Sequence, residues 1–326
     1  MALPVILDVD TGVDDACALL LAALHPALDL RAVTCVGGNA PLPDVVRNTC
    51  SVLATAGRMD VPVAAGADRP LLEDAVDARH VHGADGMGDL NWPLGTQAPD
   101  PRHAIELLRD QLAAAAASGE RITLIPLAPL TTIALLLRTY PEAARGIERI
   151  VFMGGAAASG NATASAEFNI FHDPEAAAIV FDATADLAIP MTMYGLDVFY
   201  RPRITRAEAQ LLRALDPTGP AGLGGRLISF QCDRFGADDA TIGDAGAVCA
   251  VIDPSGLTTT PLPARVELSG RYTRGRTIVD HRDWSGDLAH DPHGQSEVVL
   301  DVALGVDAPA YAALWLDTLR TTGKRG

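Results

Sequence analysis

The chain has 326 residues, of which 48% are hydrophobic and 20% are charged, so it can form one large packed domain. Its formal net charge of −16 repels phosphate groups, which argues against nucleic acids and anionic membranes as partners. No apolar run reaches the roughly 20 residues of a membrane helix. The N-terminus lacks a basic region followed by a long apolar stretch, and the five cysteines form no CxxC pair. We therefore expect a cytoplasmic protein with buried, reduced thiols.

Short apolar runs that predict strands alternate along the chain with segments that predict helices. In chain order we expect a strand at 4–10, a helix at 14–25, a strand at 30–38, a helix at 44–57, a strand at 61–67, a helix at 101–119, a strand at 121–127, a helix at 129–141, and strands at 147–155 and 185–197. Continuous apolar strands between helices favour a mostly parallel central sheet flanked by helices. We expect a single Rossmann-like α/β domain over residues 1–326.

Ligands of such sheets bind beyond the carboxyl ends of the strands. Polar residues follow several expected strands here, among them Asp10 after the first and Asn39 after the second. We expect the site at this edge, with the loops at about 76–92, 217–240 and 280–295 bordering it. The glycine-rich start of the second of these segments favours a flexible loop.

Four aspartates lie within the eight residues DVDTGVDD: Asp8, Asp10, Asp14 and Asp15. Carboxylates that converge in a partly dry site raise each other's pKa values, and a divalent cation relieves this repulsion. Oxygen ligands favour a hard ion such as calcium or magnesium. An EF-hand loop that began at Asp8 would need a carboxylate at its twelfth position, which is Leu19. The alternative to a metal site is helix capping by the last two aspartates, combined with solvation.

The same stretch also resembles the aspartate-nucleophile motif of the haloacid-dehalogenase phosphatases. In that interpretation Asp8 is the nucleophile and Asp10 is the acid/base. That family normally holds its phosphate with a later lysine or arginine, and no basic residue stands out at an expected strand end.

An ordered set of motifs resembles the inosine-uridine-preferring nucleoside hydrolase family. Its N-terminal signature is matched by DVDTGVDDA, and its second strand with a following asparagine is matched by VTCVGGNA. Its histidine-bearing loop fits HVHGADGMGD, and its middle strand, turn and helix fit LIPLAPLTTIA. Its sugar-binding stretch fits VFMGGAA followed by GNATASAEFNIFHDPEAA, and its late metal aspartate fits IGDAGAVCAVIDP. The resemblance runs from residue 5 to about 305.

This resemblance implies calcium-dependent hydrolysis of the N-glycosidic bond of ribonucleosides, which yields ribose and free base. Calcium would be held by Asp10, Asp15, Asp244 and the backbone carbonyl of Leu127. Asp10 would be the general base on a calcium-bound water that attacks C1′. Anionic and amide oxygens around the sugar would stabilise an oxocarbenium-like transition state.

The resemblance also implies a substrate-binding set. Its members are Asp14, Asn39, Met153, Asn161, Glu167, Asn169, Gln231 and Phe235. Several have structural alternatives: Asn39 or Asp244 as turn residues, Glu167 as a helix cap and Met153 as a core residue. For the two residues from the segment at 217–240, packing within a helix is the alternative.

The sequence departs from the family at the base-binding end. Many members have a histidine directly before the late metal aspartate, a proposed acid for a purine leaving group, but here that position is Gly243. His82 is then the next candidate catalytic residue, with His80 as a further candidate. The family often has a histidine after LDVT, whereas here LDVFY places Phe199 and Tyr200.

These departures keep two other functions open. One is hydrolysis of a modified or non-standard ribosyl compound, and the other is calcium-dependent ribose binding without catalysis. The preference between purines and pyrimidines stays open as well. The segment 280–293 carries three histidines, and His290 with His293 would form a weak zinc pair. We favour a solvated loop over the site mouth or a subunit contact, and the resemblance implies a homodimer or homotetramer.

Overall fold

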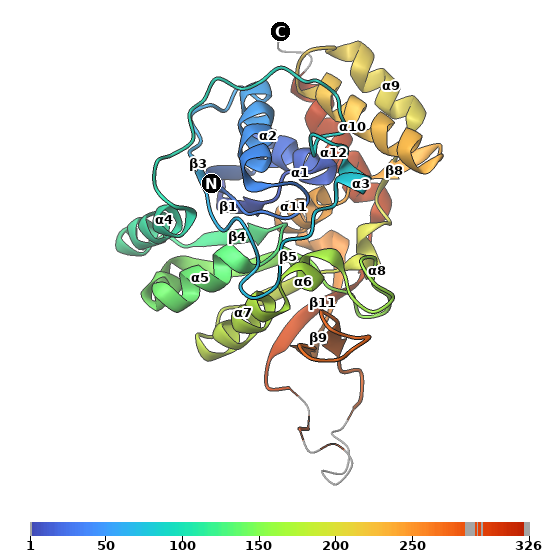
Figure 1. Ribbon diagram of the computed structural model, residues 1–326. Helices are drawn as coiled ribbons and strands as arrows, with labels where there is room; N and C mark the ends of the chain where they lie inside the picture. The colour runs from blue at the N-terminus through green and yellow to red at the C-terminus, as the bar shows by residue number, and fades with distance from the viewer. Residues whose placement is uncertain (1, 284–290, 292, 295, 323–326) are drawn as a thin grey trace.

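The computed structural model describes residues 2–283, 291, 293–294 and 296–322 (Figure 1). Within these residues nine strands form one sheet, in the order β10-β9-β11-β6-β5-β4-β1-β2-β3. Seven neighbouring strands run parallel: β1 (Leu3–Val9), β2 (Leu28–Cys35), β3 (Val63–Ala65), β4 (Ile122–Pro126), β5 (Ile147–Met153), β6 (Met191–Tyr194) and β11 (Val299–Val306). At one edge β9 (Leu257–Val266) and β10 (Thr277–Val279) pair antiparallel. A small separate sheet joins β7 (Arg203–Thr205) to β8 (Asp239–Thr241).

Helices cover both faces of the large sheet (Figure 1). The buried side chains form two hydrophobic cores. The first core contains residues of α1 (Val13–Leu24), α2 (Leu42–Thr55), α9 (Arg206–Leu215), α10 (Pro220–Phe235), α11 (Ala245–Ile252) and α12 (Ala308–Thr322). The second core contains α4 (Ala104–Ser118), α5 (Thr131–Thr139) and α7 (Pro174–Asp186). Side chains alternate along β1, so that Leu7 packs into the first core and Ile6 into the second. This alternation explains why β1 is apolar on both faces.

Short helices lie in the connections: α3 (Arg79–His82), α6 (Phe168–His172), α8 (Leu196–Phe199), and two 3-10 turns at Pro141–Gly146 and Pro254–Gly256. The sheet has a switch point between β1 and β4, because the chain goes from β1 toward β2 and β3 on one side and later returns to β4 on the other. A crevice is expected at such a point, outside the carboxyl ends of the strands. The prediction of a single α/β domain with a mostly parallel sheet is confirmed.

Two of the expected elements differ from the structure. The strand expected at 185–197 is only β6, because α7 extends through Asp186 and precedes it. The loop expected at 217–240 is mainly helix α10, with Pro220 at its start. Its glycines serve close packing: a Cβ on Gly224 would lie 2.6 Å from Leu319 Cδ1 and 3.2 Å from Trp315 of α12. The segment borders the site, but as a helix.

The described residues of the segment 280–295 lie away from the site cavity. None of them lines the site cavity, whereas Asp291 and His293 line a separate hollow beside β9 and β10. The reason is the position of the segment, which follows β10 at the outer edge of the sheet. Residues 284–290, and with them His290 of the zinc pair, lie outside the described residues.

All five cysteines are free and buried, as the sequence predicted. None of the helices in the described part of the chain combines the length and apolar character needed to cross a membrane.

Candidate active site

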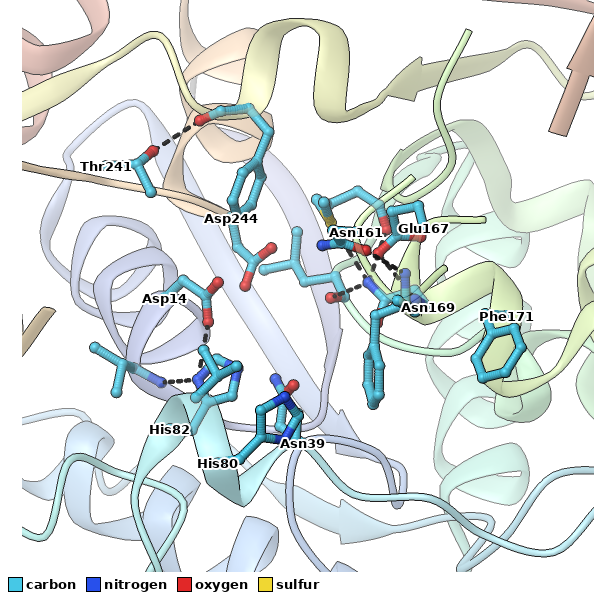
Figure 2. A pocket seen from close by; sticks show the side chains of 18 of the residues that line it. Asp14, Asn39, His80, His82, Asn161, Glu167, Asn169, Phe171, Thr241 and Asp244 are labelled. Carbon is cyan, nitrogen blue, oxygen red and sulfur yellow. Dashed lines mark hydrogen bonds and ion pairs between the residues drawn. The ribbon is translucent and has the colours of Figure 1, made fainter. Parts of the chain in front are cut away.

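A cavity of about 370 Å³ opens at the carboxyl ends of β1, β4 and β5 (Figure 2). Eleven residues of the predicted set line it: Asp14, Asn39, His82, Leu127, Met153, Asn161, Glu167, Asn169, Gln231, Phe235 and Asp244. The two remaining members of that set, Asp10 and Asp15, have no exposed surface. Their carboxylates are joined to the lining through Asn39. Residues from at least seven separate segments of the sequence therefore meet at one place.

The N-terminus of α1 holds the first carboxylate of the site. Asp15, the third residue of that helix, accepts hydrogen bonds from the backbone N–H of Gly12 at 2.9 Å and of Asp10 at 3.2 Å. A carboxylate is stabilised there because the first N–H groups of a helix have no partner within the helix and carry partial positive charge. Helix capping therefore accounts for Asp15 in part. It does not account for the other aspartates.

Asn39, which follows β2, connects two of these aspartates. Its side-chain Nδ2 donates to Asp10 Oδ1 at 3.0 Å and to Asp15 Oδ2 at 3.1 Å. Its backbone N–H donates to Asp10 Oδ2 at 2.7 Å, and its carbonyl accepts from Ala78 before α3. Asn39 is thus more than a turn residue, because it holds both carboxylates and the loop beside the cavity.

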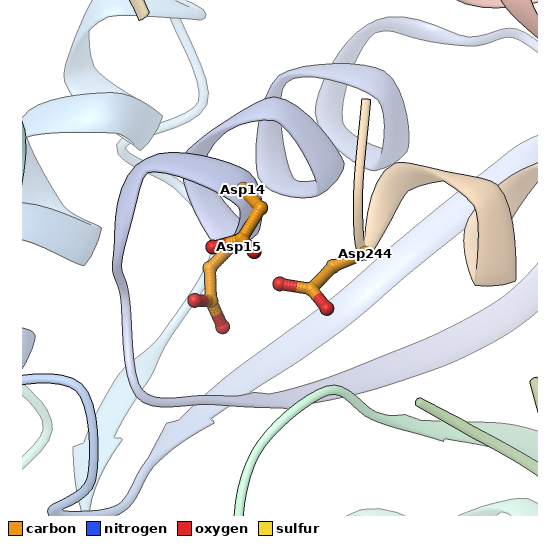
Figure 3. Close-up of side chains that lie close together, drawn as sticks. All are labelled: Asp14, Asp15 and Asp244. Atoms are coloured by element: carbon orange, nitrogen blue, oxygen red, sulfur yellow. The ribbon is translucent and has the colours of Figure 1, made fainter. Parts of the chain in front are cut away.

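Three carboxylates converge at the floor of the cavity (Figure 3). One oxygen each of Asp14, Asp15 and Asp244 lies within 4.8 Å of the others. Asp244 comes from the turn before α11, and the other two come from the first turn of α1. The predicted metal set shares Asp15 and Asp244 with this cluster. Asp14, which we expected at the ribose, joins this cluster, and Asp10 is linked to Asp15 through Asn39.

Burial makes this cluster unfavourable without a cation. It raises the pKa of Asp15 to about 7, and the neighbouring charge of Asp14 adds to the effect. Burial, followed by the charges of Asp14, Asp15 and Asp10, holds the pKa of Asp244 well above its usual range. Burial, and then the charge of Asp15, also raises the pKa of Asp10 well above its usual range. One oxygen of Asp14, Oδ1, is buried without a hydrogen-bond partner among the described residues.

These donors fit a hard divalent cation, because all of them are oxygens and the carboxylates repel one another in its absence. Leu127 also lines the cavity, and its backbone carbonyl is a further oxygen donor. It accepts one hydrogen bond, from Asn169 Nδ2 at 2.9 Å, and a second lone pair remains. The cluster can therefore bind a metal ion.

Asp8 supports the site from the interior of β1. Its Oδ1 accepts from the Thr34 hydroxyl at 2.6 Å, while its Oδ2 is buried without a described partner. Burial raises the pKa of Asp8 to about 7. Asp8 does not line the cavity, which removes the geometric basis for the phosphatase interpretation, where this residue would attack the substrate.

The wall opposite α1 is built from residues around α6. The Glu167 carboxylate accepts from the backbone N–H of Gly155 at 2.9 Å, Asn169 at 2.8 Å and Ile170 at 3.2 Å. Glu167 therefore caps α6, and burial raises its pKa to about 7. The side chain of Asn169 donates to the carbonyls of Leu127 and Met153. Both polar groups are held rigidly at the cavity surface.

His82, at the end of α3, forms part of another wall (Figure 2). Its Nδ1 accepts a hydrogen bond from the backbone N–H of Val13, at the start of α1, at 3.1 Å. Burial lowers the pKa of His82, and Asp14, whose Oδ1 lies 3.6 Å from Nδ1, opposes this effect. Because Nδ1 is an acceptor, the neutral ring carries its proton on Nε2. His80 also lines the cavity, and its carbonyl accepts from Arg234 of α10.

Gln231 and Phe235 of α10 also line the cavity; Gln231 is buried, whereas Phe235 is 64% exposed. The structure adds lining residues that the sequence did not single out: Val13, Val76, Asp77, Ala78, Val81, Ala162, Phe168, Phe171 and Thr241. Phe168 and Phe171 stand three residues apart in α6, so they share one helix face. The spacing of these two phenylalanines could have indicated them from the sequence alone. The other positions depend on contacts between distant segments.

A profile of the family described as "Inosine-uridine preferring nucleoside hydrolase" matches residues 5–313. The chain belongs to this family. It is 40% identical over 290 residues to the "Pyrimidine-specific ribonucleoside hydrolase RihA" of Enterobacter sp. (strain 638), covering 88% of this chain and 90% of that one. It is 38% identical over 325 residues to the "Inosine-uridine preferring nucleoside hydrolase" of Crithidia fasciculata, covering 98% of each.

Solved structures agree with this assignment. A "Plant nucleoside hydrolase" superposes with a TM-score of 0.86 at 29% identity, covering 98% of this chain and 99% of that one. A "Purine-Preferring Ribonucleoside Hydrolase from Gardnerella vaginalis" also gives 0.86 at 29% identity, covering 99% and 100%. The predictions of the family and of an enzyme of the nucleoside N-ribohydrolase class are confirmed. The names of these members of the nucleoside hydrolase family differ in base preference, so membership alone leaves the base open.

Proposed function

We propose that this protein hydrolyses the N-glycosidic bond of ribonucleosides to ribose and free base, and that the reaction depends on calcium. The observation that carries the proposal is the floor of the cavity, where Asp14, Asp15 and Asp244 converge. Beside them lie the anchored amide of Asn169 and the carboxylate of Glu167, both suited to sugar hydroxyls. Membership of a nucleoside hydrolase family supports the same conclusion.

Calcium would be held by the predicted set, Asp10, Asp15, Asp244 and the carbonyl of Leu127, with Asp14 as a neighbouring carboxylate. When bound, the cation would polarise a water molecule and fix the vicinal ribose hydroxyls. The raised pKa values of Asp15 and Asp244 support this assignment, because a bound cation would compensate for burial and for the mutual repulsion by favouring the ionised carboxylates.

The protein's own groups then have distinct tasks in the reaction. Asp10 accepts the proton of the attacking water as its oxygen bonds to C1′. The C1′–N bond breaks, and its electron pair goes to the base nitrogen, which finally takes up a proton. Glu167, Asn161, Asn169 and Met153 surround the sugar, and the anionic and amide oxygens stabilise the positive charge that develops on it. His82 can offer its Nε2 proton to the base, since Val13 occupies Nδ1.

Gly243 favours a second candidate, hydrolysis of a modified or non-standard ribosyl compound. A glycine at this position provides no proton donor for the base. A base that departs readily without protonation would suit this site. Good turnover of ordinary inosine, adenosine, uridine and cytidine would contradict this second candidate.

We also propose that the protein is cytoplasmic and forms a homodimer or homotetramer. Light scattering of the purified protein would test the oligomeric state.

The decisive experiment is ribose release from purine and pyrimidine ribonucleosides and their 2′-deoxy counterparts, with and without chelator. Release that stops with chelator and requires the 2′-hydroxyl is the expected result. Release that continues in chelator would overturn the role of calcium. Tight nucleoside binding without any release over long incubation would instead favour a calcium-dependent ribose-binding protein.

A further inference from the structure

The backbone at Gly243 leaves no room for a side chain. Its φ is +55°, a left-handed conformation that other residues rarely adopt. A Cβ there would lie 2.5 Å from the Cβ of Asp14 and 3.1 Å from Cζ of Phe199. Both neighbours would have to move before any side chain could occupy this position. The ring of Phe199 therefore takes the space next to Gly243.

Phe199 is held in this position from several sides. It ends α8 and is 6% exposed, and its ring lies edge-on to Tyr200 with centroids 4.9 Å apart. Its carbonyl accepts from the Thr241 hydroxyl at 2.7 Å, and that hydroxyl accepts from the Gly243 N–H at 3.0 Å. Figure 2 shows the bond that Thr241 donates. Phe199 and Gly243 are thus joined by packing and by one shared hydroxyl.

This arrangement defines the chemistry of one cavity wall. Phe199, Tyr200, Gln231 and Thr241 all line it. The Thr241 hydroxyl already donates one hydrogen bond and accepts another within the protein. Gln231 Nε2 donates to the Thr241 carbonyl at 3.3 Å. None of these four side chains carries a charge at neutral pH. The groups that this wall offers to a ligand are therefore mainly the aromatic side chains of Phe199 and Tyr200.

We propose that Phe199 is a specificity-determining residue that selects ligands whose base is a planar aromatic ring, and that glycine at position 243 is what allows its ring to reach the cavity. This inference rests on the proposed ribonucleoside substrate. Stacked and edge-on aromatic contacts add attraction beyond buried area, and a puckered, saturated ring cannot make them. Phe199 therefore favours a riboside whose base is an intact heteroaromatic ring over one whose base is saturated.

Uridine and 5,6-dihydrouridine provide a matched pair of probes, because they share the sugar and the polar groups but only uridine has an aromatic ring. Free ribose provides a probe without a base. Dissociation constants would be measured by calorimetry with excess calcium, in an Asp10→Asn background that preserves the nucleoside. We expect uridine to bind about 3- to 10-fold more tightly than dihydrouridine.

Phe199→Ala and the bulk-preserving Phe199→Leu should both reduce this preference to within about twofold while ribose affinity stays unchanged. A preference that survives both substitutions overturns the proposal. An equal loss of ribose affinity also overturns it, since Phe199 would then have only a structural role. If the unmutated protein releases no ribose but the binding pattern holds, hydrolysis fails as the function and the role of Phe199 stands.

The packing argument has its own test in a double-mutant cycle. Gly243→Ala should weaken uridine binding strongly in the protein that retains Phe199. In the Phe199→Ala background the loss should be clearly smaller, because the clash of the new Cβ with the phenyl ring is gone. Backbone strain from the left-handed conformation is present in both backgrounds and cancels from the cycle. Equal losses in the two backgrounds would show that glycine is not required to admit the ring.

Discussion

Removal of divalent cations should reverse the usual pH dependence of stability in this protein. Most proteins are destabilised by acid because their carboxylates are paired or hydrogen-bonded in the folded state. Here burial raises the pKa values of Asp8, Asp15 and Glu167 to about 7. The folded chain consequently binds protons more tightly than the unfolded chain at these positions.

The size of the effect follows from the pKa shifts. For Asp8 the rise from 3.8 to about 7 corresponds to about 4 kcal/mol, at about 1.4 kcal/mol per unit. This contribution is fully present below the unfolded pKa near 3.8 and is lost as pH rises through about 7. Burial lowers the pKa of His172 to about 4 and also lowers the pKa of His82, so these two groups act in the opposite direction and offset part of the combined effect of the three carboxylates. Asp60 and Asp110, with lowered pKa values, are ion-pair partners of arginines near the surface and contribute little.

Urea unfolding at constant ionic strength would measure this dependence. In chelator, the free energy of unfolding should be at least about 2 kcal/mol higher at pH 5.5 than at pH 8. With excess calcium the order should reverse, since the cation binds the ionised carboxylates of the folded state. Asp244→Asn removes one charge of the cluster and should weaken both the pH dependence and the effect of calcium. Chelated protein that is equally stable or more stable at pH 8 would refute the reasoning.

Three further substitutions test individual contacts. Asp10→Asn should lower kcat by about 10²- to 10⁴-fold without lowering the urea midpoint, and unchanged turnover would exclude Asp10 as the general base. Asn39→Ala removes the amide that donates to Asp10 and Asp15, so calorimetry should show about 10- to 100-fold weaker calcium binding. Arg234→Ala breaks the link to the His80 carbonyl, so steady-state kinetics should show a higher KM with little change in kcat; a loss confined to kcat would contradict this.

Local patterns predicted most of the sheet and helices, because apolar periodicity is a property of short segments. The errors occurred where a distant contact decides the conformation. The glycines of α10 favour a loop when they are considered alone, yet Gly224 lies against Trp315 and Leu319 of α12. The segment before β6 is apolar whether it ends a helix or begins a strand, so its sequence could not distinguish the two.

The site could be predicted residue by residue but not contact by contact. The carboxylates of DVDTGVDD indicated a cation, and the structure brings two of them to Asp244, more than 200 residues later in the chain. Asp14 and Asp10 lie four residues apart, and nothing local decides which of them faces the cluster. Asn39 decides it, because this single residue donates two hydrogen bonds to the carboxylate of Asp10.

The first turn of α1 also holds two groups of the site in place at once. Its N–H groups serve both halves of the cavity: Gly12 donates to Asp15 on the metal side, and Val13 donates to His82 on the other. Gly12 has no space for a side chain, since a Cβ would lie 2.6 Å from His82 Nδ1 and 2.8 Å from Asn39 Nδ2. The carboxylate cluster and the orientation of His82 therefore depend on the same few peptide groups. A change in this turn should therefore alter the proposed metal site and the proposed contact of His82 with the base together.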